Sequence, residues 1–140
     1  MSEIDTTFLS YAEKAADSIS SYRNKAFILN LIAVEYAKAG QTQKALLIFD
    51  KAVNAAGSIS DDDDKAWALS DIAKELAKAG QTQKALLIFD KALDVAGLMY
   101  NNSDKAWALS DIALELAKAG RFDDALNAAG SISSNSSKAS

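Results

Sequence analysis

Apolar side chains recur three and four residues apart along most of the chain, as they do on the buried face of a helix. Between residues 66 and 77 the stripe consists of Ala66, Leu69, Ile72, Ala73, Leu76 and Ala77. A second stripe runs over residues 85–96, where Leu87, Ile88 and Val95 widen the apolar arc. So wide an arc needs cover on two sides, which predicts helical hairpins that stack on neighbouring hairpins. The expected helices span residues 5–19, 22–38, 42–56, 62–78, 82–98, 103–118 and 122–130.

The sequence also repeats itself with a period of 40 residues. The segment 65–73 (KAWALSDIA) recurs at 105–113, and the segment 37–52 (AKAGQTQKALLIFDKA) recurs at 77–92. We divide the chain into a half repeat, 1–24, and repeats 25–64, 65–104 and 105–137. Such a unit buries its apolar faces only against its neighbours. The pattern predicts one all-α solenoid domain, 1–130, of antiparallel hairpins, followed by a Ser-rich tail, 131–140, expected to be disordered.

Glycine and polar residues mark the ends of the expected helices. Gly80 suits the left-handed position that ends a helix, and Thr82 is expected to cap the helix that follows. Four aspartates at 61–64 precede another helix, where acidic residues oppose the positive end of the helix dipole. A site for calcium or for a basic partner is the alternative. The run lacks the alternating ligands and glycine turn of a calcium loop, so we favour capping.

Composition narrows the classes of function. The chain has 15 Lys and Arg against 19 Asp and Glu, a formal net charge of −4, and it contains no proline, cysteine or histidine. An acidic chain matches phosphate backbones poorly, so no nucleic-acid partner is expected. The commonest metal ligands and the commonest general base are missing, so we expect no metal, no cofactor and no catalysis.

Two further patterns bear on location and chemistry. No apolar run approaches the roughly 20 residues that span a bilayer, and residues 1–5 carry no secretory signal, so we expect a cytoplasmic chain without a membrane partner. Glu35, Glu75 and Glu115 each lie three residues before a lysine, which favours surface ion pairs over catalytic acids. The identical repeats fit recent duplication and engineered construction equally, and the chain could be a piece of a longer array.

The hairpin pattern resembles the tetratricopeptide repeat family. The family's large, small, glycine, alanine and aromatic positions are matched in the second repeat by Leu69, Ile72, Ala73, Leu76, Gly80, Ala85, Phe89 and Ala92. The first repeat supplies all of these positions from Leu29 to Ala52, whereas the third supplies them only from Leu109 to Ala125 and then departs, because its second helix is short. The 40-residue period departs from the usual 34. The resemblance implies a right-handed superhelix used as a protein-interaction scaffold.

In that family the first helix of each hairpin lines a concave groove that holds a peptide or protein partner. The matching positions here are Phe27, Asn30, Leu31, Val34, Trp67, Asp71, Lys74, Lys78, Trp107, Asp111, Leu114 and Lys118. The aromatic row of Phe27, Trp67 and Trp107 is the sharpest candidate, although packing between repeats would also explain it. The family's clamp of Lys, Asn and Arg for a peptide carboxylate is not present in that form.

The charged groove positions have a second explanation. Asp71 and Asp111 are expected to pair with nearby lysines such as Lys74 along the helix. Lys78 and Lys118 also suit the negative end of their own helices. In either role, these side chains would stabilise the chain itself and would not contact a partner protein.

Self-association is the alternative function. Leu116, Phe122 and Leu126 are expected to stay partly uncovered, because the last repeat is short. At the other end, the segment with Phe8 and Tyr11 (and Leu9 between them) lacks a hairpin partner. Open ends of this kind favour end-to-end contacts in a homo-oligomer.

Overall fold

The computed structural model describes residues 7–99, 101–118 and 120–139, with side chains described to residue 130. Within these ranges the chain forms helices and no strand. The helices are α1 (Thr7–Asp17), α2 (Tyr22–Lys38), α3 (Thr42–Gly57), α4 (Asp62–Lys78), α5 (Thr82–Ala96), α6 (Asn102–Lys118) and α7 (Phe122–Ala139). None of these helices is both long enough and apolar enough to cross a membrane.

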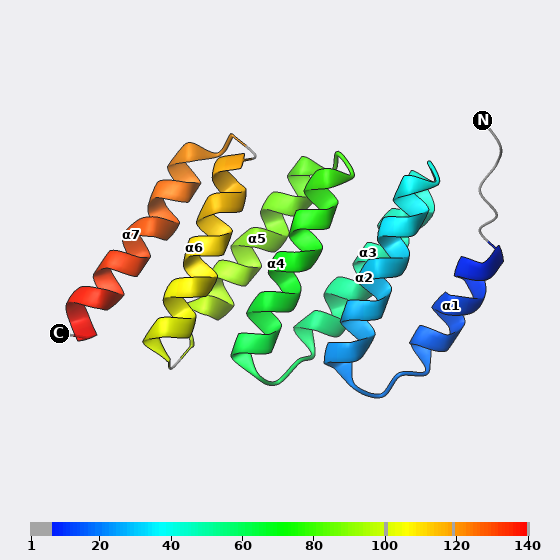
Figure 1. Ribbon diagram of the computed structural model, residues 1–140, viewed down its shortest axis with the longest axis horizontal. Helices are drawn as coiled ribbons and strands as arrows, with labels where there is room; N and C mark the ends of the chain where they lie inside the picture. The colour runs from blue at the N-terminus through cyan, green and yellow to red at the C-terminus, as the bar shows by residue number, and fades with distance from the viewer. Residues whose placement is uncertain (1–6, 100, 119, 140) are drawn as a thin grey trace.

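Three antiparallel hairpins stand side by side (Figure 1). Within each hairpin, α2 packs on α3, α4 on α5 and α6 on α7, and these are the most extensive contacts. Neighbouring hairpins meet through α3 and α4 and through α5 and α6, and their first helices also touch, α2 with α4 and α4 with α6. In Figure 1, α2 and α4 lie in front of α3 and α5, so the first helices form one layer and the second helices another. The predicted all-α solenoid of helical hairpins is confirmed.

A left-handed glycine closes each hairpin. Gly40, Gly80 and Gly120 have φ of +79°, +83° and +81°, which L side chains rarely adopt. After α4 the amide of Gly80 donates to the carbonyl of Ala77, and the amide of Gln81 donates to Leu76. This pair of bonds satisfies the last carbonyls of the helix. The glycine prediction is confirmed, but the cap prediction is wrong: Thr82 is the first residue of α5, and Gln81 precedes it without a side-chain cap.

Side chains cap the first helix of each hairpin. The Asp61 carboxylate accepts a hydrogen bond of 2.9 Å from the amide of Asp64, and Ser21 accepts the equivalent bond at the start of α2. The Asn101 side chain accepts from the amides of Ser103 and Asp104. The four-aspartate run is therefore a capped helix start, as the sequence predicts.

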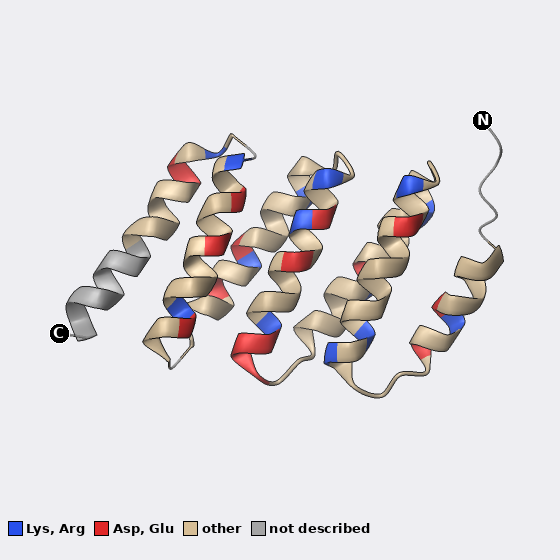
Figure 2. Ribbon diagram, in the orientation of Figure 1, with Lys and Arg blue, Asp and Glu red and all other residues tan. Residues whose placement is uncertain are grey.

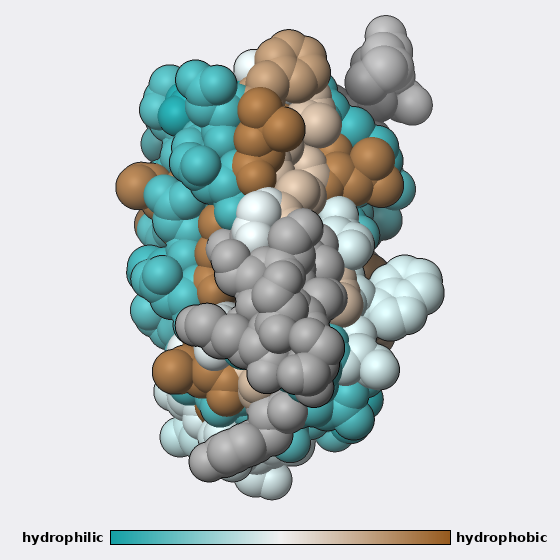
Figure 3. All heavy atoms as spheres, turned by 90° about the vertical axis from the view of Figure 1, so that its left-hand side faces the viewer, coloured by the Kyte–Doolittle hydropathy of each residue, from teal (hydrophilic) through white to brown (hydrophobic). Residues whose placement is uncertain are grey.

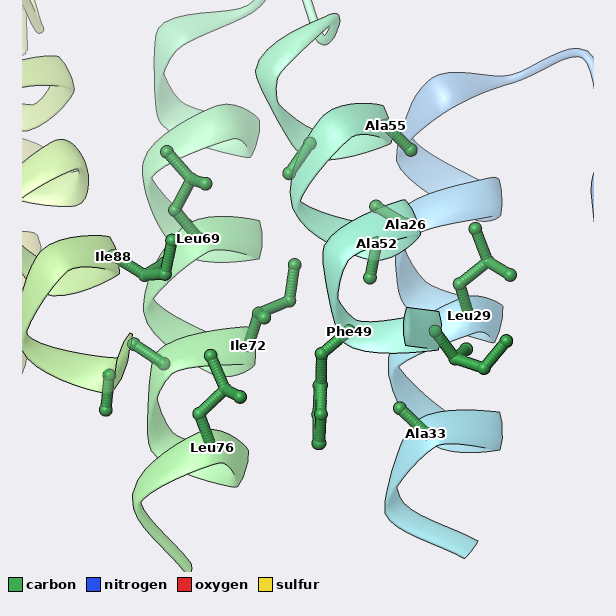
Figure 4. Packing of buried hydrophobic residues seen from close by; sticks show 14 of the residues in the cluster. Ala26, Leu29, Ala33, Phe49, Ala52, Ala55, Leu69, Ile72, Leu76 and Ile88 are labelled. Carbon is green, nitrogen blue, oxygen red and sulfur yellow. The ribbon is translucent and has the colours of Figure 1, made fainter. Parts of the chain in front are cut away.

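In each of the first two hairpins, one aromatic side chain fills the space between the layers. Phe49 is 1% exposed and lies between Leu29 and Ala33 on one side and Ile72 and Leu76 on the other (Figure 4). Phe89 is equally buried one repeat later. Burial of a side chain this large contributes roughly 1.5–3 kcal/mol relative to exposure. The core is thus a continuous row of junctions between adjacent hairpins.

Charged side chains attach α1 to the first hairpin. Lys51 Nζ on α3 lies 2.8 Å from Glu13 Oε2 and 3.0 Å from Asp17 Oδ2, and Lys44 Nζ lies 3.2 Å from Glu13 Oε1. Partial burial opposes ionisation of Glu13, but hydrogen bonds and charge from Lys51 and Lys44 prevail and lower its pKa. The pKa of Lys51 is raised, chiefly by its hydrogen bond to Glu13 and further by Asp17, although partial burial acts in the opposite direction. This acid–base cluster fixes an element that has no hairpin partner.

The two ends differ in detail from the expectations. Helix α7 continues to Ala139, whereas the sequence predicted a helix ending near residue 130 and a disordered tail beyond it. The interval contains no proline to stop the helix. Leu116, expected to be partly uncovered, is 1% exposed because α6 turns it toward the core. Phe8 and Tyr11 remain exposed on α1, as the sequence predicts.

Candidate partner-binding site

A hollow of about 650 Å³ separates the first helices of two adjacent hairpins, α2 and α4. We call it the α2–α4 groove. Six of the predicted groove residues line it, namely Phe27, Asn30, Leu31, Trp67, Asp71 and Lys74. They come together because residues three and four apart on each helix share the face between the hairpins. The structure thus brings into one hollow six of the residues that the family resemblance assigned to a groove.

Aromatic and aliphatic side chains form the apolar part of the groove. Phe27 is 59% exposed and Leu31 is 47% exposed, although both are large apolar residues. Trp67 is half-buried and faces the same hollow from α4. Trp107, at the equivalent place on α6, is 70% exposed and does not line the groove. The predicted aromatic row is therefore divided, and only its first two members share one hollow.

Asn30 supplies a buried polar group to the groove wall. The residue is 7% exposed, and its Oδ1 has no hydrogen-bond partner. A buried carbonyl oxygen without a donor costs about 1–3 kcal/mol. An N–H group entering the groove would remove that cost. The repeat equivalents of Asn30 are Ser70 and Ser110, so this carboxamide occurs in one repeat only.

Asp71 is an acid in the groove without an ion pair or hydrogen bond to any described residue. The groove walls reduce its hydration and so raise its pKa, even though part of the side chain remains exposed. The charge of Lys74 acts in the opposite direction, while the negative charges of Asp111 and Glu75 add to the increase. The carboxylate thus lies in a place that favours a cationic neighbour.

Lys74 is committed to the next hairpin. Its Nζ lies 3.3 Å from Asp111 Oδ2 on α6, and both side chains are largely buried, with 27% and 18% exposure. The expected ion pair between Asp71 and Lys74 along α4 is therefore wrong. An approach between adjacent first helices, which the spacing within one helix does not reveal, takes the lysine away from Asp71.

Besides Trp107 and Asp111, four predicted groove residues lie outside the α2–α4 groove. Lys78 and Lys118 each form an ion pair three residues back along their helix, with Glu75 at 3.4 Å and Glu115 at 3.2 Å. Val34 is half-buried and packs against the core. Leu114 lines a different hollow at the C-terminal end. The lysines and Val34 are thus occupied by contacts within the chain.

The sequence analysis missed the charged entrance of the groove. Arg23 and Asp64 line it, and Arg23 Nε lies 3.8 Å from Asp64 Oδ1. The acidic start of α4 is visible in red in Figure 2. Arg23 and Asp64 lie just before Lys25 and Lys65, which open the first two repeats, but the residue types at these positions differ between repeats, so the period did not reveal the entrance.

The equivalent contact at the next junction is repulsive. A shift of 40 residues carries Arg23 onto Asp63 and Asp64 onto Asp104. Neighbouring atoms reduce the hydration of Asp63, and Asp104 shares a hydrogen bond with it, so the pKa of Asp63 is raised. Attraction at one junction is thus replaced by repulsion at the next.

A second hollow, of about 560 Å³, lies on the C-terminal hairpin between α6 and α7. Leu114, Phe122 and Leu126 line it and are 54%, 67% and 69% exposed. Figure 3 views the molecule from this end, where apolar surface gathers in brown patches. The repeat equivalent of Leu126 is Leu86, which is only 9% exposed because another hairpin follows it. In the earlier repeat, the equivalent leucine is covered by the hairpin that follows it.

A third hollow, also about 650 Å³, lies on the layer of second helices and is lined by Leu87, Ile88 and Lys91. Lys84 Nζ lies 3.1 Å from Asp50 Oδ1 at its edge. None of the predicted groove residues line it. Among the residues described, no group of acids has the arrangement of a metal site.

Comparison with known proteins agrees with this architecture. The tetratricopeptide repeat family matches residues 24–97. The crystal structure of Ton1535 from Thermococcus onnurineus NA1 has a similar fold, with a TM-score of 0.73 and 28% sequence identity. That match covers 90% of this chain but only 37% of the Ton1535 chain. A comparison with curated proteins gave no match. The family match spans more than half of the sequence, and the chain therefore belongs to the tetratricopeptide repeat family.

Proposed function

We propose that the chain is a protein-interaction module that holds a peptide segment of a partner in the α2–α4 groove. Tetratricopeptide repeats generally mediate binding between proteins and are typically scaffolds without catalytic activity. The observation that carries the proposal is the combination of exposed Phe27 and Leu31 with the unpartnered carboxamide of Asn30 in one hollow. Apolar side chains with a few converging polar groups are typical of binding sites.

Selection from a display library of random peptides, followed by titration of the selected peptides, tests this function. In Phe27→Ala we expect about tenfold weaker binding, because an exposed aromatic anchor typically contributes about 1–2 kcal/mol. Leu47→Ala is the matched control. Leu47 is 61% exposed on α3, outside the groove, so its loss should leave affinity unchanged. Equal affinity of both variants, or no selected peptide, would contradict the proposal.

Self-association is the second candidate, supported by the uncovered hollow on the C-terminal hairpin. A second copy of this chain would cover Leu114, Phe122 and Leu126 as the following hairpin covers Leu86. Light scattering over a wide concentration range would give a mass that grows toward a dimer. Leu126→Glu should abolish that growth, whereas Leu47→Glu should not. A monomer mass at every concentration would reject self-association and leave the groove as the functional surface.

A further inference from the structure

The repeat itself indicates what the acid in the α2–α4 groove lacks. A shift of 40 residues carries Asp71 onto Asp111 and Val34 onto Lys74. At the junction of α4 and α6, the carboxylate of Asp111 receives the ammonium group of Lys74 at 3.3 Å. At the junction of α2 and α4, the place of that lysine belongs to Val34, which has no charge. Asp71 consequently lacks the cation that its equivalent has.

We propose that the α2–α4 groove selects its peptide by a basic side chain, whose cation takes the place beside Asp71 that Lys74 occupies beside Asp111. This inference rests on the proposed function and names the chemistry of the segment that binds. An N–H group of the same segment donates to Asn30 Oδ1, which has no partner in the free chain. Both groups lie in one hollow, so a single short segment reaches both.

The other charged side chains of the groove also favour a positively charged ligand. Arg23 faces Asp64 at the entrance, and Lys74 is held by Asp111. The two cations that line the groove are thus engaged, while Asp71 is not. An acidic segment would meet Asp64, Asp71 and Glu75 without a free cation to receive it. Like charges placed together in this way cost binding energy and exclude such partners.

The apolar wall also suits a cation. Trp67 and Phe27 line the groove together with Asp71, and a Lys or Arg head group is attracted to the face of an aromatic ring. The aliphatic stem of the basic side chain packs on apolar surface while its charged end reaches the carboxylate. A charge-assisted hydrogen bond to Asp71 is stronger than one between neutral groups.

Two matched peptide libraries test this inference. One encodes Lys and Arg but no Asp or Glu, and the other encodes Asp and Glu but no Lys or Arg. We expect binders from the basic library only, and their affinity should fall as salt is added. Binders that come equally from both libraries, or only from the acidic one, overturn the basic-side-chain inference while the peptide-binding function stands. No binder from either library overturns both.

Three variants then locate the cation. Asp71→Asn should weaken binding of the selected basic peptides about tenfold, which is the loss of affinity expected when one charged pair is removed. Asp90→Asn removes the same charge from an exposed position on α5 outside the groove and should change nothing. Val34→Lys should weaken binding as much as Asp71→Asn does, because its ammonium occupies the place of the ligand cation. Circular dichroism checks that each variant is folded, and unchanged affinity in folded Asp71→Asn would overturn the inference.

Discussion

Single residues at equivalent repeat positions decide whether neighbouring hairpins attract or repel each other. Arg23 faces Asp64 at the first junction, whereas Asp63 faces Asp104 at the second. Val34 leaves Asp71 without a cation at the first junction, whereas Lys74 pairs with Asp111 at the second. The backbone repeats, but the charges do not, so each junction carries its own electrostatic character.

The raised pKa of Asp63 makes the second junction sensitive to pH. Because the folded chain holds the proton of Asp63 more tightly than the unfolded chain does, this group stabilises the fold at low pH. That contribution is lost as the pH rises through the folded pKa. Once Asp63 is ionised, its repulsion from Asp104 opposes folding.

Replacing Asp63 by arginine should therefore stabilise the fold at neutral pH. Asp63→Arg copies the first junction and pairs with Asp104, so we expect a higher melting temperature than wild type at pH 7. The gain over wild type should shrink as the pH falls, because wild-type Asp63 then takes up its proton and the repulsion is lost. Asp63→Asn, which removes the repulsion without adding a cation, should lie between the two. A lower melting temperature for both variants at pH 7 would contradict this account.

At the scale of elements, the turn glycines set the hairpin geometry. A Cβ added to Gly80 would meet no atom within 4 Å, so its φ of +83° is the sole source of strain there. Gly80→Ala should cost about 1–2 kcal/mol, the price of a left-handed backbone for an L residue. Gly57→Ala is the control, since Gly57 has equally open space and no left-handed φ. Urea unfolding measures both, and equal stabilities would show that backbone strain is negligible at Gly80.

Elements were predictable where one residue type determines the backbone. Gly80 marked the turn before α5, because few other residues adopt its conformation. Thr82 was wrongly expected to cap α5, because the helix begins at Thr82 itself and Gln81, the residue before it, makes no side-chain cap. The residues of the groove wall came from the family resemblance, which said nothing of the partner of Lys74. Its choice of Asp111 over Asp71 depends on the approach of α6, which periodicity within one helix does not encode.

At the scale of the whole molecule, stability should vary along the row of hairpins. Among the described residues, the extensive contacts between hairpins join neighbours, so each unit depends on the cover that its neighbours provide. Hydrogen exchange should be slowest in α4, which has a hairpin on both sides, and faster in α1 and α7, each covered on one side. The expected ratio is at least tenfold. Uniform exchange along the chain would instead show that the hairpins unfold as one unit.

The left-handed turns and the identical segments around them also affect how the chain folds. Because residues 37–52 and 77–92 are identical, α5 offers α2 the same surface that α3 does. The native pairing closes the short turn 39–41, whereas the misregistered pairing closes a loop over residues 39–81. The longer closure costs about 2 kcal/mol more by chain entropy alone. The short glycine turn thus favours pairing of each helix with its neighbour in the sequence over pairing with the identical helix of another repeat.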